Sequence, residues 1–188
     1  MHITGGRYKG LNVKTAKTMS IRPTTAKVRE AVFGILGSSV EGASFLDVFA
    51  GSGIMGLEAL SRGAALVSFV DSSHQSVSVI RENLARLKAL AGRSRINKSD
   101  AVRFLSQDSG YDIIYIDPPY KSSLREETLR ALDTEQGRFP QTVIIRTFKK
   151  YILEYFPAFF TLDSERNYGD MKLYFFHRSP RNENTAGR

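Results

Sequence analysis

The pattern of hydrophobic and polar positions alternates between two kinds of segment along most of the chain. From Phe45 onward, short runs of β-branched and aromatic residues are followed by stretches in which apolar residues recur every three or four positions. This alternation of strands and helices is typical of a parallel, doubly wound sheet. The expected strands are 45–49, 66–70, 95–97, 111–116 and 142–146, and the expected helices are 53–62, 74–90, a short one from about 101, and 123–133.

The two ends of the chain have different patterns. Residues 1–22 combine glycines with short alternating apolar residues, which predicts a small hairpin that must pack on the main domain or on a ligand. A helix is expected after Arg22-Pro23-Thr24-Thr25, with Val28, Ala31, Val32 and Ile35 on one face. Residues 159–162 and 171–177 predict two strands joined by a turn that is too short for a crossover helix, so this pair is expected to be antiparallel. We therefore expect a hairpin extension over residues 1–22, a main domain over 23–178 and a disordered tail over 179–188.

The positive charge of the chain is concentrated at its amino end. The net charge is +8, from 27 basic and 19 acidic residues, which suggests an anionic partner. Residues 1–30 carry seven basic side chains and one acid, whereas residues 31–177 carry equal numbers of each sign. The alternative is a solvated basic face, but the clustering favours contact with nucleic acid. The candidate residues for this contact are Arg7, Lys9, Arg22, Lys27 and Arg29.

Composition limits the other classes of site. The chain has no cysteine, which excludes disulfide bonds and thiolate metal ligands, and its three scattered histidines do not form a metal cluster. No apolar run approaches the ~20 residues that a membrane span needs, and the first residues are too polar for a signal peptide. We therefore expect a cytoplasmic protein without a metal. The sequence does not determine the oligomeric state, and a monomer is the plain expectation.

A glycine-rich turn joins the first expected strand to its helix. Residues 47–56 read DVFAGSGIMG, and Asp71 stands twenty residues after Gly51, at the end of the second strand. This pattern is a dinucleotide fingerprint in which the acid binds ribose hydroxyls, so a nicotinamide or flavin enzyme is one hypothesis. The other is S-adenosylmethionine, because Asp47 would repel a pyrophosphate but attract the ammonium group of an amino acid. Asp100, after the third strand, either accepts from the adenine amine or caps the next helix.

The tetrapeptide Asp117-Pro118-Pro119-Tyr120 ends the strand 111–116. Prolines cannot continue a central strand, so the Asp117 carboxylate is set at the carboxyl end of a strand, where open α/β sheets bind ligands. We hypothesise that Asp117 and the Pro118 carbonyl accept hydrogens from a nucleobase amine, and that Tyr120 stacks on the base, a contact worth ~1–3 kcal/mol. The alternatives are an aspartate that starts a turn and a half-buried loop tyrosine.

Together, the motifs at 47–53 and 117–120 resemble those of S-adenosylmethionine-dependent amino-group methyltransferases. GGRYKG at 5–10 and RPTTAKVRE at 22–30 narrow the resemblance to the RsmD-like 16S rRNA (guanine-N2)-methyltransferase family, and it extends through Tyr168-Gly169-Asp170. The resemblance implies a Rossmann-like methyltransferase fold, with a mostly parallel seven-stranded sheet, an antiparallel carboxyl-terminal strand pair, and a small amino-terminal β-hairpin and helix. Two positions depart from the family pattern, since Arg146 and Ser73 both stand where an acid is expected.

The resemblance also implies a reaction. It is the transfer of a methyl group from S-adenosyl-L-methionine to a guanine amine of 16S rRNA, as free RNA or as a small ribosomal subunit particle. The alternatives are a DNA adenine amino-methyltransferase, a glutamine methyltransferase for protein, and a non-catalytic RNA-binding ribosome assembly factor. The expected catalytic residues are Asp117, Pro118, Pro119 and Tyr120, and the expected cofactor-binding residues are Asp47, Phe49, Gly51, Gly53, Asp71 and Asp100.

Overall fold

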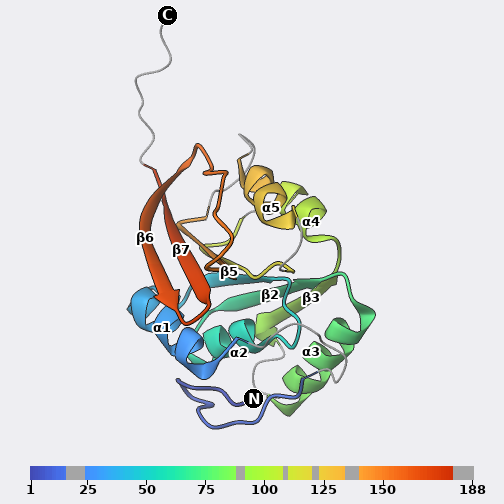
Figure 1. Cartoon of the computed structure of the whole chain (residues 1–188). Helices are drawn as coiled ribbons and strands as arrows, with labels where there is room; N and C mark the ends of the chain where they lie inside the picture. Colours follow the sequence, from blue (N-terminus) through green and yellow to red (C-terminus); the bar gives the residue numbers. More distant parts are fainter. Residues whose placement is uncertain (16–23, 88–91, 108–109, 120–122, 134–139, 180–188) are drawn as a thin grey trace, which may run out of the picture.

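A seven-stranded sheet runs through the molecule in the order β3-β2-β1-β4-β5-β7-β6 (Figure 1). The structure is a computed structural model that describes residues 1–15, 24–87, 92–107, 110–119, 123–133 and 140–179. Strands β1 to β5 are parallel to one another, whereas β7 runs antiparallel to both β5 and β6. The expected α/β fold class, with its antiparallel carboxyl-terminal pair, is confirmed. The strands are β1 (Ser44–Val48), β2 (Leu66–Asp71), β3 (Ser94–Lys98), β4 (Ile113–Ile116), β5 (Thr142–Phe148), β6 (Phe160–Tyr168) and β7 (Met171–Arg178).

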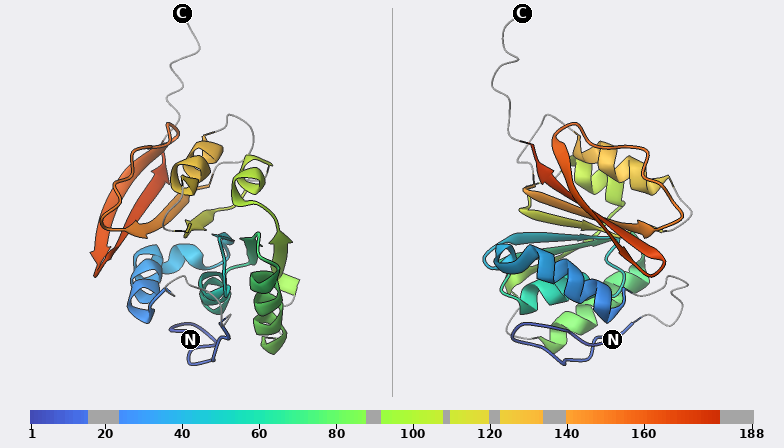
Figure 2. Two further views of the ribbon diagram at one scale, coloured as in Figure 1. Left: turned by 45° about the vertical axis from the view of Figure 1, so that its right-hand side comes forward. Right: turned by 60° about the vertical axis from the view of Figure 1, so that its left-hand side comes forward.

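Helices cover both faces of the sheet (Figures 1 and 2). Helices α1, α2 and α3 lie on one face, and α4 and α5 lie on the other. Most bounds agree with the expected ones to within a few residues, but β6 is longer than expected and continues to Tyr168. The helices are α1 (Ala26–Leu36), the short 3-10 helix η1 (Gly37–Val40), α2 (Ile54–Ser61), α3 (His74–Arg86), α4 (Ala101–Gln107) and α5 (Leu124–Leu132).

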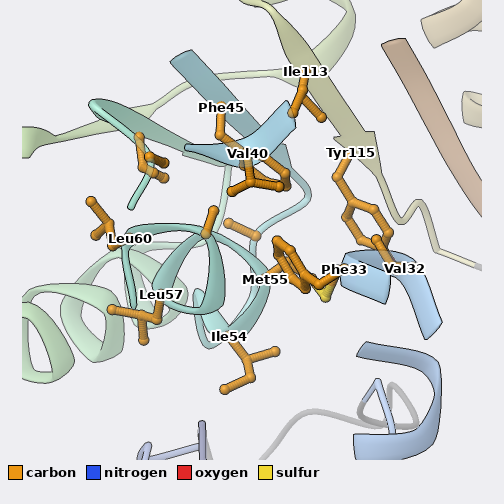
Figure 3. Packing of buried hydrophobic residues seen from close by; sticks show 14 of the residues in the cluster. Val32, Phe33, Val40, Phe45, Ile54, Met55, Leu57, Leu60, Ile113 and Tyr115 are labelled. Atoms are coloured by element: carbon orange, nitrogen blue, oxygen red, sulfur yellow. The ribbon is translucent and has the colours of Figure 1, made fainter. Parts of the chain in front are cut away.

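The core consists of one hydrophobic cluster on each side of the sheet. Successive side chains of a strand point to opposite faces, so alternate residues of β4 enter different clusters. Ile113 and Tyr115 pack on the α1 side, and Ile114 and Ile116 pack on the side of α4 and α5. The close view shows Tyr115 directed from β4 toward α1 (Figure 3). Burial on both faces explains why the inner strands β4 and β5 are near-continuous apolar runs, whereas the edge strands β3 and β6 are more polar and partly exposed.

Helix α1 buries a somewhat different face from the one that its sequence pattern predicts. Val28 and Val32 are buried as expected, but Ile35 is 44% exposed. Phe33 takes its place, with its ring stacked on Phe45 of β1 at a centroid distance of 6.0 Å. The expected face was therefore wrong at Ile35, because α1 packs against α2 as well as the sheet.

The amino-terminal segment packs on the end of α2. An isolated antiparallel bridge joins His2 to Asn12, so residues 1–15 form a bridged loop rather than a hairpin of regular strands. The backbone N–H of Tyr8 donates to Ser61 Oγ at 2.9 Å. Gly6 has φ +75°, and a Cβ there would lie 2.0 Å from the Ser61 carbonyl oxygen, so this close approach requires glycine. Residues 16–22 and the expected tail after residue 179 lie outside the described residues.

Candidate active site at the carboxyl edge of the sheet

Three acidic residues meet at the carboxyl ends of neighbouring strands. Asp47 lies near the end of β1, Asp71 ends β2, and Asp117 directly follows β4. The strands β2, β1 and β4 are adjacent and parallel, so their carboxyl ends share one edge. The sheet therefore gathers the three acids that the sequence marked as candidate binding or catalytic groups.

Asp47 is buried and has little to offset its charge. The Asp47 residue is only 2% exposed, and its Oδ2 accepts a hydrogen bond from the Gly56 backbone N–H at 2.9 Å. Burial raises the pKa of the Asp47 carboxyl well above its usual value, the Gly56 N–H opposes this rise, and the charges of Asp117 and Asp71 add to it. A cationic group bound beside Asp47 would relieve this unfavourable burial.

Asp71 organises the glycine loop, a role that the sequence did not indicate. Its Oδ2 accepts from the Gly51 backbone N–H at 2.8 Å, and its Oδ1 accepts from the Ser73 backbone N–H at 2.8 Å. Each carboxylate oxygen has a second lone pair, so the side chain retains capacity for ribose hydroxyls. Ser73, one of the two departures from the family pattern, is the N-cap of α3, where its hydroxyl accepts from the Ser76 backbone N–H at 3.4 Å.

The loop between β1 and α2 depends on left-handed backbone conformations. Gly51 and Gly53 have φ of +56° and +77°, and a Cβ at Gly53 would lie 3.1 Å from side-chain atoms of Phe69 and Ile80. Phe49 also has a positive φ, +60°, which costs a non-glycine residue of order 1–3 kcal/mol. Such strain is typical of binding loops. Contact of Phe49, Gly51 and Gly53 with the cofactor stays a prediction.

Asp100 caps α4. Its Oδ1 accepts from the Arg103 backbone N–H at 2.9 Å, and its carbonyl accepts from the Phe104 backbone N–H at 3.0 Å. These bonds account for an aspartate at this position without a ligand. Contact between Asp100 and the adenine amine stays a prediction.

Asp117 is held by two donors from distant parts of the chain. Arg146 Nε on β5 lies 2.7 Å from Asp117 Oδ1, and Thr24 Oγ1 donates to Oδ2 at 3.2 Å. Burial raises the pKa of the Asp117 carboxyl, while the charge and hydrogen bond of Arg146 and the hydrogen bond of Thr24 oppose the rise.

Sequence reasoning missed both partners as site residues. Arg146 was noted only as a departure from the expected family pattern, and Thr24 only as part of a helix start. Pro118 is buried and Pro119 half-buried. The predicted stacking residue Tyr120 lies outside the described residues.

The basic residues proposed from the sequence lie in different environments. Arg7, Lys9 and Lys27 are exposed, and Arg22 lies outside the described residues. Arg29 corrects the expectation, because its side chain is 2% exposed and its Nε lies 3.2 Å from Glu58 Oε1. It also donates to the Thr24 and His2 carbonyl oxygens. Arg29 is turned into the contact between α1 and α2, so it is not available to RNA in this conformation.

The described part of the chain contains neither a candidate metal site nor a candidate membrane span. Within those residues, no group of three or more histidine, cysteine, aspartate or glutamate side chains is placed to hold a metal ion. None of the helices in the same ranges is long and apolar enough to cross a membrane.

Comparison with known proteins identifies similar chains of nearly the same length. Residues 1–177 match the family model described as "Conserved hypothetical protein 95". The Escherichia coli K12 protein "Ribosomal RNA small subunit methyltransferase D" is 33% identical over 188 residues, which cover 99% of this chain and 94% of that protein. "Putative rRNA methyltransferase YlbH" of Bacillus subtilis is 36% identical over 140 residues, 72% of this chain and 76% of that protein. The solved structure "Putative methyltransferase yhhF from Escherichia coli" superposes with a TM-score of 0.84 at 31% identity, covering 96% of this chain and 99% of that one.

Proposed function

We propose a function from the premise that this chain belongs to the RsmD methyltransferase family, which is described as Conserved hypothetical protein 95. In this proposal the chain transfers a methyl group from S-adenosylmethionine to the exocyclic amine of a guanine in small-subunit ribosomal RNA. The observation that carries the proposal is the placement of Asp47, Asp71 and Asp117 at one edge of the sheet, beside the glycine loop. A methyl donor and a base amine need adjacent sites, and this edge offers acids for both.

The charge of the site favours S-adenosylmethionine over a dinucleotide. Asp47 is buried, its pKa is raised by burial, and Asp71 and Asp117 add negative charge nearby. A pyrophosphate would increase this repulsion, whereas the ammonium and sulfonium groups of S-adenosylmethionine would reduce it. When bound, the cofactor supplies an activated methyl group on its sulfonium. In the proposal Asp47 holds the ammonium group, Asp71 the ribose hydroxyls and Asp100 the adenine amine, while the backbone at Phe49, Gly51 and Gly53 allows close approach.

Asp117 and the Pro118 carbonyl form the acceptor half of the site. The lone pair of an exocyclic amine is delocalised into its ring, which makes the nitrogen a poor nucleophile. Two fixed acceptors that bind its hydrogens draw the nitrogen toward a pyramidal geometry and orient it for in-line attack, an effect that can supply several kcal/mol. As positive charge develops on the nitrogen, the Asp117 carboxylate stabilises it, and the surplus proton passes to Asp117 or to water. Pro119 fixes the turn, and Tyr120 stacks on the base.

The exposed cations of the amino-terminal region are proposed to hold the RNA. Arg7, Lys9 and Lys27 are exposed, and together with Arg22 they would contact phosphates, which position an RNA without reading its sequence. A base stacked inside a helix cannot reach Asp117, so the target must be single-stranded or flipped out. The small-subunit ribosomal RNA, free or in a particle, is proposed from the names of the relatives.

Methyl transfer from labelled S-adenosylmethionine tests the proposal. The wild-type chain is offered naked small-subunit rRNA, assembled small subunits, DNA and a protein mixture, and the labelled nucleotide is identified by nuclease digestion and mass spectrometry. We expect N2-methylguanine in one RNA-containing substrate. Label confined to DNA would favour the adenine amino-methyltransferase, and binding of RNA without any transfer would favour an assembly factor.

A substitution of Asp117 tests the acceptor half separately. Asp117→Asn keeps the shape of the side chain but replaces one acceptor oxygen with a donor, so we expect kcat to fall by at least about 10²–10³-fold while the dissociation constant of S-adenosylmethionine changes little. Asp163→Asn on the exposed side of β6 is the matched control and should retain full activity. Substantial turnover by Asp117→Asn would remove the activation argument.

A further inference from the structure

We propose that Arg146 is a positioning residue for Asp117: from β5 it holds the carboxylate in one orientation and in its ionised form, ready to accept the hydrogens of the substrate amine. The inference rests on the proposed function and deepens its acceptor half.

The sheet register places the two residues side by side. Ile116 of β4 pairs with Ile145 of β5 in parallel, so the next residue on each strand, Asp117 and Arg146, lies at the same level. The Arg146 Nε and Asp117 Oδ1 atoms are 2.7 Å apart, and the two side chains are 2% and 13% exposed. Arg146 also pairs with Leu173 of β7, which restrains its backbone from the other side. A residue inside the sheet thus restrains a carboxylate that follows the end of its strand.

A second contact completes the orientation of the carboxylate. The Thr24 hydroxyl donates to Asp117 Oδ2 at 3.2 Å, and the Thr24 carbonyl in turn accepts from Arg29. Each oxygen of Asp117 therefore has a donor from a different element, which defines the plane of the carboxylate. Each oxygen keeps a further lone pair with which to accept from the substrate amine.

The groups around Asp117 show why a permanent cation is needed there. Asp47 from β1, Tyr115 from β4 and Arg146 from β5 are the titratable groups whose charges couple to this part of the site. Burial raises the pKa of Asp117, and Arg146 is the cation that opposes this rise. Burial raises the pKa values of Asp47 and Tyr115, and the charge of Asp117 adds to both rises, so neither of these groups favours the ionisation of Asp117. Protonation of Asp117 would occupy one of its oxygens with a hydrogen. It would also remove the negative charge that stabilises the positive charge developing on the reacting nitrogen.

Arginine suits this position better than lysine. A guanidinium stays charged when buried, whereas a buried ammonium readily loses its proton. Its planar group also aligns Nε with a carboxylate oxygen in a defined direction. A lysine at position 146 should therefore restore the charge only in part and the orientation less well.

The test compares Arg146→Met and Arg146→Lys with the wild type, and with Arg166→Met as a control on exposed β6. Two quantities are measured over a range of pH: kcat for methyl transfer to the RNA that the wild type accepts, and the ¹³C chemical shift of the Asp117 carboxyl carbon in labelled protein. For Arg146→Met we expect the acid limb of the kcat profile and the carboxyl titration to move upward by about 1–3 pH units. We expect kcat below the shifted limb to fall about tenfold for each unit of the shift. For Arg146→Lys, the acid limb of the kcat profile and the carboxyl titration should lie between those of the wild type and those of Arg146→Met. Arg166→Met should match the wild type.

The outcomes separate this inference from the proposed function. A wild-type chain that transfers no methyl group to any RNA removes the proposed function, and with it the catalytic meaning of Arg146. Carboxyl titrations that coincide in wild type, Arg146→Met and Arg146→Lys overturn the inference even when the RNA is methylated. A loss of kcat in Arg146→Met that is equal at every pH, together with a carboxyl titration that has not moved from that of the wild type, also overturns it, because Arg146 then does not keep Asp117 ionised. Circular dichroism confirms that the variants compared are folded, and Arg146→Lys keeps the test open where Arg146→Met does not fold.

Discussion

Removal of the Arg29 side chain should reveal how strongly the amino-terminal loop and α1 are tied to α2. Arg29 and Glu58 are 2% and 0% exposed, and their Nε and Oε1 atoms are 3.2 Å apart. Glu58 Oε1 also accepts from the Thr4 backbone N–H at 2.6 Å. Arg29 donates further to the His2 and Thr24 carbonyls, so Arg29→Met removes contacts to three segments at once.

The expected cost of Arg29→Met follows from burial rather than from the ion pair itself. Breaking a buried pair leaves an uncompensated charge, and this typically costs about 3–5 kcal/mol. Glu58 keeps Arg62, whose Nε lies 3.4 Å from Oε2, so we expect a value near the lower end. Since whole domains are stable by only about 5–15 kcal/mol, this is a large fraction. For a chain of this size, 3 kcal/mol corresponds to a decrease in Tm of about 6–12 °C.

Urea unfolding followed by circular dichroism measures this cost. The matched control is Lys172→Met, which breaks the pair between Lys172 Nζ and Glu165 Oε2. These atoms are only 2.7 Å apart, but the two side chains are 21% and 38% exposed. We therefore expect the free energy of unfolding to change by at most about 1 kcal/mol. The double variant Arg29→Met with Glu58→Met should be less unstable than the sum of the single variants, because neither partner of the buried pair remains as an uncompensated charge. Equal effects of Arg29→Met and Lys172→Met would refute the reasoning that burial decides.

Two further predictions concern the cofactor and RNA sites. Asp47→Asn should bind S-adenosylmethionine about tenfold or more weakly, as judged by calorimetry. The same variant should be more stable than the wild type in urea, by a margin that grows with pH. Because the pKa of Asp47 is raised in the folded protein, the wild type loses stability as pH rises from the ordinary aspartate pKa through the pKa in the folded state. Asparagine does not titrate, so the variant does not lose this stability. A margin that stays constant between pH 4 and 8 would contradict this. Lys9→Gln and Lys27→Gln should each weaken RNA binding and reduce the magnitude of the slope of log K against log salt by about 0.7 for single-stranded RNA. The control Arg103→Gln, at an exposed position of α4, should leave the slope unchanged. Unaltered slopes in both lysine variants would count against an RNA contact at Lys9 and Lys27.

Features that depend on neighbouring residues in the chain were predicted well. The strand 111–116 had to stop at Pro118 because proline lacks an N–H for the ladder, and β4 ends at Ile116. The glycines between β1 and α2 predicted a tight turn, and Gly51 and Gly53 adopt the left-handed conformations that favour glycine. The parallel order of β1 to β5 followed from alternating strands and helices, since such connections leave few topologies. The family assignment made from these motifs is confirmed by the match over residues 1–177.

The partners of charged residues were decided by the tertiary structure alone. Arg29 was assigned to RNA because it clusters in the sequence with the other amino-terminal cations. Only the packing of α1 on α2 brings Glu58 to it and pairs the two buried side chains. Arg146 and Asp117 are 29 residues apart and meet because β4 and β5 are neighbours in a particular register. The sequence by itself thus determined the elements, the turn chemistry and the positions of the acids, because these depend on local backbone preferences. The pairing and ionisation of those acids depend on burial and on contacts across the sheet, which only the folded chain brings together.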